Sequence, residues 1–122
     1  EERILDIPQI RAWRNLDHLP LFITATCEFG RYDNPLEVSG AEETLLNARG
    51  GGIGLITTTR PVFSSTNLVL NRAFYQNVFN PLPSGEMPRL GDIVKNTKNA
   101  SQSGVVNRNF ALLGDPSMRL AY

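Results

Sequence analysis

Two short apolar runs on either side of a helix-like segment constrain the fold of this chain most strongly. Residues 21–26 and 53–58 are apolar and β-branched, and each run is too short for a typical helix. Between them, Ser39 stands three residues before Glu42, which predicts a capped helix over about residues 40–48 that ends at the glycines 50–52. A strand, a helix and a second strand in this order predict a parallel pair joined by a crossover. The sequence therefore predicts an α/β fold.

Three further helices are predicted from start signals and apolar spacing. Asp6 as a cap and Pro8 in the first turn predict a short helix near the beginning of the chain. Ser64 or Ser65 would cap a longer helix, and Pro88 would open another one. The stripes of these two helices consist of Leu70, Ala73, Phe74 and Val78, and of Leu90, Ile93, Val94 and Thr97.

The end of the chain adds the last predicted strands. Residues 110–113 form a third apolar run that ends at a turn signal, Gly114-Asp115-Pro116, and residues 118–122 could form an edge strand. Short buried strands that alternate with amphipathic helices predict an α/β sandwich. Three or four strands are few for a complete sandwich, and the chain starts without methionine, so we expect a part of a larger domain.

Composition excludes several classes of function. Twelve basic and twelve acidic side chains cancel without a one-sided cluster, which argues against a nucleic-acid partner. The longest uncharged apolar run, residues 19–27, is far shorter than the roughly 20 residues of a transmembrane helix. A single cysteine can form neither an intrachain disulfide nor a thiolate metal site. We expect no nucleic acid, no transmembrane segment, no metal and no cofactor.

Cys27 is the candidate reactive residue because it follows the first predicted strand. Functional sites in parallel sheets form at the carboxyl ends of the strands, and the segment after the second strand, including Thr59 and Arg60, would emerge at the same edge. A thiol there could be partly exposed and reactive. The alternative is a buried cysteine that only fills space, as many lone cysteines do.

His18, the only histidine, is not expected to be the base that activates Cys27. It lies nine residues earlier, at the other end of the same predicted strand. Nine extended residues span roughly 30 Å, whereas a general base must approach its proton to about 3 Å.

Residues 23–33, with the sequence ITATCEFGRYD, resemble the nucleophile segment of gingipain-family cysteine peptidases. More narrowly, they resemble the sortase-like member of the type IX secretion system. The similarity continues through residues 39–42, 52–62 and 112–116, and so covers nearly the whole chain. It implies a caspase-like three-layer αβα sandwich, in which the cysteine follows one strand and the catalytic histidine follows the preceding strand in a His-Gly motif.

This sequence contains no His-Gly pair. We therefore expect residues 1–122 to be the C-terminal part of a gingipain-like peptidase domain, inactive without the missing histidine. The resemblance also implies that the cleft wall includes Ala25, Thr59 and Arg60. Glu28 would either orient a substrate or anchor the loop at Gly30.

The implied activity is that of a cysteine endopeptidase and transpeptidase. It would remove the C-terminal signal domain of secreted cargo through a Cys27 thioester, and transfer the cargo to a lipopolysaccharide amine. The resemblance thus implies export to the outer membrane at the cell surface, with cargo proteins, lipopolysaccharide and other type IX secretion components as partners. Two alternatives stay open: a peptidase-like scaffold with an inert cysteine, and an unrelated α/β domain.

Overall fold

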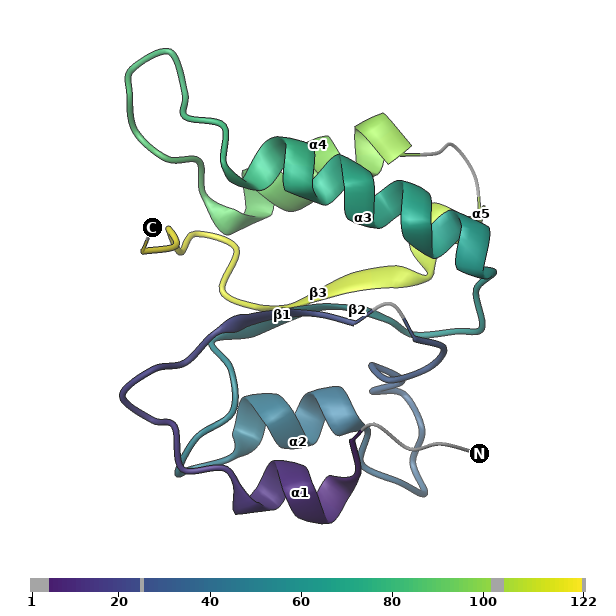
Figure 1. Cartoon of the computed structure of the whole chain (residues 1–122). Helices are drawn as coiled ribbons and strands as arrows, with labels where there is room; N and C mark the ends of the chain where they lie inside the picture. Colours follow the sequence, from purple (N-terminus) through teal and green to yellow (C-terminus); the bar gives the residue numbers. More distant parts are fainter. Residues whose placement is uncertain (1–4, 25, 102–104, 122) are drawn as a thin grey trace.

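A three-stranded sheet lies between two layers of helices (Figure 1). The computed structural model describes residues 5–24, 26–101 and 105–121. The strands are β1 (Leu21–Ile23), β2 (Gly54–Thr58) and β3 (Phe110–Gly114), in the spatial order β1-β2-β3. β1 and β2 are parallel, as predicted, and β3 pairs with β2 in the antiparallel direction. The predicted α/β class is therefore confirmed, with a mixed sheet.

On one face of the sheet lie α1 (Ile7–Ala12) and α2 (Gly40–Leu46), with α2 next to the sheet and α1 packed on the outer side of α2 (Figure 1). Both helices start where their sequences predict. Asp6 and Ser39 are the caps, and each forms a complete capping box with the side chain three residues later. Each box satisfies backbone donors that the first turn of a helix leaves free.

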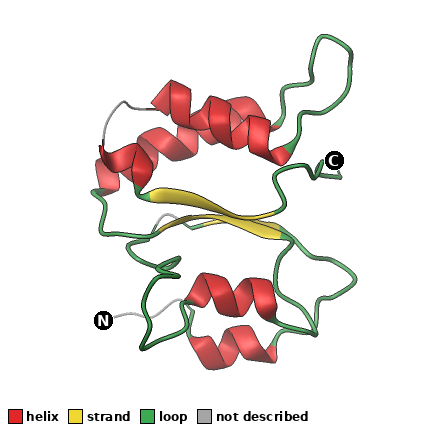
Figure 2. Ribbon diagram, turned by 180° about the vertical axis from the view of Figure 1, so that it is seen from behind, coloured by secondary structure: helices red, strands yellow, loops and turns green. Residues whose placement is uncertain are grey.

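The second layer contains α3 (Ser64–Val78), α4 (Leu90–Ser101) and the short α5 (Val105–Arg108), on the opposite face of the sheet (Figure 2). The predicted stripes are confirmed, because all of their residues are buried. Their larger apolar members, all except Ala73, pack with Ile56 of β2 and Phe110 of β3, so the main core lies between the sheet and this layer.

The predictions of two helix starts and of the last strand are wrong. Pro88 does not open α4, which begins two residues later at Leu90. Phe63, rather than Ser64 or Ser65, is the N-cap of α3; no side chain caps this helix, and Ser64 is already its first helical residue. Residues 118–121 add no strand to the sheet, and their only pairing among the described residues is a bridge between Arg89 and Arg119. After β3 the chain turns at Asp115, whose carboxylate accepts from the Ser117 amide at 2.8 Å, and the amide of Leu90, at the start of α4, then donates to the Met118 carbonyl at 2.8 Å.

Candidate functional site

Cys27 is exposed and lies four residues after the end of β1, which ends at Ile23 rather than at residue 26 as predicted. Its thiol donates to the carbonyl oxygen of Val62, with Sγ and O 3.4 Å apart. Val62 belongs to the segment after β2, so the predicted proximity of this segment to Cys27 is confirmed. The carbonyl of Thr26 also accepts a hydrogen bond from the Thr58 hydroxyl at the end of β2. The alternative of a buried, space-filling cysteine is therefore wrong.

The backbone turns sharply immediately after the thiol. Glu28 has a φ of +58°, which is the left-handed region that residues with side chains rarely occupy. Its carboxylate pairs with Arg31 at 3.1 Å, and its carbonyl accepts from the Arg31 amide at 3.1 Å. These contacts close the turn that begins with Cys27, and the role of Glu28, either in orienting a substrate or in anchoring this loop, stays a prediction.

The loop after Cys27 is fastened to the sheet and to α2. The Gly30 amide donates to the Thr58 carbonyl at 2.9 Å. A side chain at position 30 would overlap the side chain of Thr57, so glycine is required by this close approach. The carbonyl of Phe29 accepts from the Ala41 amide at 3.0 Å, in the first turn of α2.

Arg60 joins the segment after β2 to the loop after Cys27. Its guanidinium binds both carboxylate oxygens of Asp33, at 2.9 and 2.5 Å. The hydrogen bond from Arg60 holds the pKa of the Asp33 carboxyl below its ordinary value, and the carboxylate in turn raises the pKa of Arg60. Both side chains are about half exposed, at 45% and 46% of their surface.

The other predicted cleft residues differ in their surroundings. Thr59 is buried, and both its amide and its hydroxyl donate to the Asn109 carbonyl, at 2.7 and 3.2 Å. Ala25 lies outside the described residues. A role in the cleft wall stays a prediction for Ala25, Thr59 and Arg60.

His18 lies at the amino end of the sheet, away from Cys27, as predicted. Its amide donates to the Asn15 carbonyl at 2.9 Å, in the turn before β1. The side chain of Asn15 in turn accepts from the Gly51 amide at 2.9 Å, three residues before β2 begins. This network ties His18 to the edge of the sheet opposite the thiol, because β1 and β2 are parallel.

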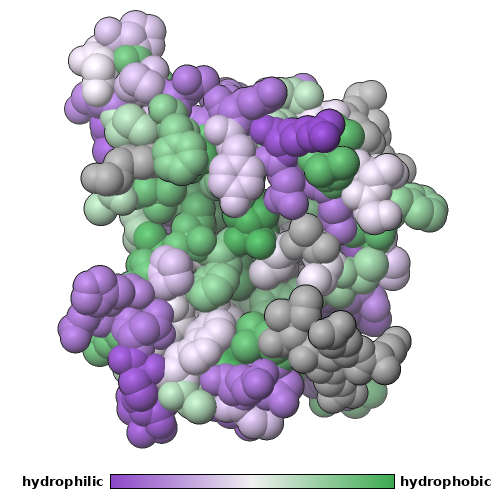
Figure 3. All heavy atoms as spheres, viewed as in Figure 1, coloured by the Kyte–Doolittle hydropathy of each residue, from purple (hydrophilic) through white to green (hydrophobic). Residues whose placement is uncertain are grey.

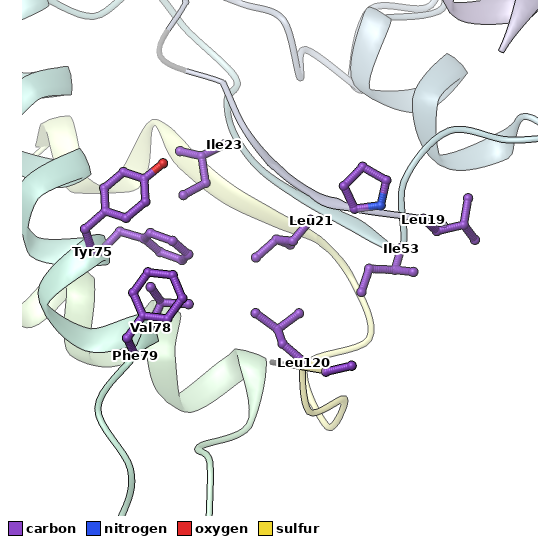
Figure 4. Close-up of a pocket in the computed structure, with 11 residues that line it drawn as sticks. Leu19, Leu21, Ile23, Ile53, Tyr75, Val78, Phe79 and Leu120 are labelled. Carbon is purple, nitrogen blue, oxygen red and sulfur yellow. The ribbon is translucent and has the colours of Figure 1, made fainter. Parts of the chain in front are cut away.

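The surface of the molecule has an apolar pocket beside β1 and a polar pocket beside the loop that follows Cys27. An apolar pocket of about 390 Å³ opens between β1 and α3, where Leu21 and Ile23 face Tyr75 and Val78 (Figure 4). Apolar side chains gather in the middle of the same face of the molecule (Figure 3). Cys27 does not line this pocket. We call residues 27–33, the loop that begins with Cys27, the thiol loop. A smaller, polar pocket of about 160 Å³ lies next to this loop and is lined by Glu28, Arg31, Asn34, Glu37, Val38 and Ser39.

The described residues were also compared with the requirements of a metal site and of a membrane-spanning helix. No three histidine, cysteine or acidic side chains gather there in a group that could hold a metal ion. No helix there is both long and apolar enough to cross a membrane.

Sequence reasoning missed the pairing of Asp33 with Arg60. The available signal was opposite charge in two loops that the parallel strands bring to one edge of the sheet. The contact between the thiol and Val62 had no such signal, because every residue carries the same backbone carbonyl.

Comparison with known proteins identifies one family. The model of peptidase family C25 matches residues 1–121. No curated protein matches the sequence significantly, and neither does any solved structure.

Proposed function

Because this chain belongs to peptidase family C25, a family of cysteine peptidases, we propose that Cys27 is the nucleophile of a peptidase site. The observation that carries this assignment is the exposed thiol at the carboxyl end of β1, next to the segment after β2. Substrate can reach such a thiol, and loops from neighbouring strands can form a cleft around it.

The thiol reacts as a thiolate, so it must first lose its proton and leave the Val62 carbonyl, which accepts a bond only from the protonated form. The thiolate then attacks the scissile carbonyl carbon. The carbon–nitrogen bond breaks, the amine leaves with a proton, and a thioester forms on Cys27. Water or an amine attacks the thioester and regenerates the thiol. In this proposal the amide of Cys27 stabilises the oxyanion, and a base other than His18 takes the proton from the thiol and gives it to the leaving amine.

The finer part of the proposal concerns the substrate. We assign to the intact protein the removal of a C-terminal signal domain from secreted cargo and the transfer of the new carboxyl end to a lipopolysaccharide amine. It would act at the outer membrane, together with other components of type IX secretion. The support for this assignment is the resemblance of residues 23–33 to the sortase-like member of that system.

Cargo processing by the intact protein tests the proposal. Cys27→Ala and Cys27→Ser should both lower the processing rate by at least about a thousandfold, because removal of the nucleophile leaves no route to the thioester. Ser84→Ala, in an exposed loop, is the matched control and should process cargo normally. Normal processing by the Cys27 variants would refute the assignment and favour a scaffold with an inert cysteine.

A further inference from the structure

The Asp33–Arg60 pair connects the two segments that flank the thiol. Asp33 lies in the loop that Cys27 begins, and Arg60 lies just after β2. Both carboxylate oxygens are engaged, which gives the planar guanidinium a defined orientation. Arg60 also donates to the carbonyl of Thr59 at 2.7 Å, so its position is set relative to its own backbone as well.

Arg60 lies close in the chain to the residue that contacts the thiol. Val62, two residues further on, provides the carbonyl that contacts Cys27 Sγ. The hydrogen bonds that join Gly30 and Thr26 to β2 both end at Thr58, the last residue of that strand. They fasten the thiol loop to the sheet and leave the segment after β2 to be placed by other contacts.

Given the proposed peptidase function, we propose that the Asp33–Arg60 pair positions the Cys27 loop against the segment 60–62, and that Arg60 acts through Asp33 rather than by binding substrate. The pair is a positioning device because it sets the distance between the thiol and the segment beside it. Half-exposed ion pairs contribute little to overall stability, so the expected effect is on local geometry rather than on folding.

The competing role for Arg60 makes opposite kinetic predictions. An arginine that binds an acidic group of the substrate would have to leave Asp33 first. Loss of the carboxylate in Asp33→Asn would then free Arg60 and lower KM, whereas Arg60→Gln would raise KM. If the pair positions the loop, Asp33→Asn and Arg60→Gln should change the kinetics in the same direction, because each substitution breaks the same contact.

Steady-state processing by the intact protein separates the two roles. We expect Asp33→Asn and Arg60→Gln each to lower kcat by about two- to tenfold with little change in KM. The double variant should lose no more than either single variant, and the exchange Asp33→Arg with Arg60→Asp should recover part of kcat. Opposite shifts of KM in the two single variants would overturn the inference.

The matched control is Glu86→Gln, which removes another exposed ion pair, that of Glu86 with Arg119 at 3.3 Å. It should leave kcat and KM unchanged, because neither residue contacts the thiol loop among the described contacts. Equal losses in Glu86→Gln and Asp33→Asn would also overturn the inference.

Alkylation of Cys27 tests the geometry without any need for processing. Iodoacetamide labelling, followed by mass spectrometry of the peptide that contains Cys27, should be about two- to fivefold faster in Asp33→Asn and Arg60→Gln than in Glu86→Gln, because release of the segment 60–62 uncovers the sulfur. The exchanged pair should restore slow labelling. Equal labelling in all variants would refute positioning, whereas normal processing by Cys27→Ala would refute only the peptidase function.

Discussion

At the scale of single residues, two backbone positions shape the turn after Cys27 for different reasons. Glu28 occupies the left-handed region despite its side chain, and its pairing with Arg31 helps to hold it there. Gly30 lacks a side chain because the loop lies directly against Thr57, which is fully buried in β2. The exposed thiol is thus supported by one strained residue and one tightly packed residue.

Gly30→Ala should destabilise the protein. The added methyl group would overlap the Thr57 side chain, and such overpacking costs about 1–3 kcal/mol of the free energy of unfolding. Urea denaturation of the variant and the wild type would measure this difference.

Thr57→Ala provides the control for this prediction. The atoms closest to the added methyl group belong to the Thr57 side chain, so Gly30→Ala should cost less in a Thr57→Ala background. Thr57→Ala will itself lower stability, since its hydroxyl shares a hydrogen bond of 2.7 Å with Thr24. The same cost of Gly30→Ala in both backgrounds would show that another contact is responsible.

At the scale of elements, an ion pair joins the two helices of the first layer. Arg11 of α1 binds both carboxylate oxygens of Glu43 on α2. The Glu43 side chain is only 15% exposed, whereas that of Arg11 is 64% exposed, so the carboxylate is the more constrained partner. The hydrogen bond from Arg11 lowers the pKa of Glu43 below its ordinary value of 4.5.

This shift predicts how stability depends on pH. A carboxyl whose pKa is lower in the folded state stabilises the fold above its unfolded pKa, and this contribution is lost as the pH falls through the folded pKa. The Tm of the wild type should therefore exceed that of Glu43→Gln near neutral pH, and the difference should shrink as the pH falls below 4.5. Thermal melts of both proteins across this range would measure it.

The pKa values of Asp33 and Asp115 are also lowered below their ordinary value. However, the wild type and Glu43→Gln both contain these two aspartates. Their contributions should largely cancel in the comparison. A difference in Tm that stays constant with pH would show that Glu43 acts through packing rather than through its charge.

At the scale of the whole molecule, the two faces of the sheet are covered unequally. The main core cluster joins the sheet to α3 and α4 and includes Ile56, Phe74 and Phe110. On the other face, α2 lies next to the sheet and α1 lies beyond it (Figure 1), and the buried apolar residues of these two helices are Ile10 and Ala41. Packing of α3 and α4 is therefore expected to dominate overall stability.

Phe74→Ala should cost about 3–5 kcal/mol of the free energy of unfolding, because it removes a large side chain that is 3% exposed in the core cluster. Gln76→Ala, two residues further along α3 and exposed, is the matched control and should change stability by less than about 0.5 kcal/mol. Chemical denaturation would measure both values. Similar small losses in the two variants would contradict the dominant role of this layer.

The sequence by itself determined the features that depend on neighbouring residues. The capping boxes at Asp6 and Ser39, the buried stripes of α3 and α4, and the three strands all arise from patterns a few residues long. The nine residues that separate His18 from Cys27, together with the predicted strand between them, were enough to place the two residues at opposite edges of the sheet.

Only the tertiary structure decided the contacts between distant segments. The pairing of Arg89 with Arg119, the contact of Cys27 with Val62 and the choice of Asp33 as the partner of Arg60 are examples. Each depends on how separate elements pack, and local preferences of a few tenths of a kcal/mol per residue are readily overridden by packing. The place of the thiol at the end of a strand is therefore set by the sequence, whereas its surroundings are set by the assembled fold.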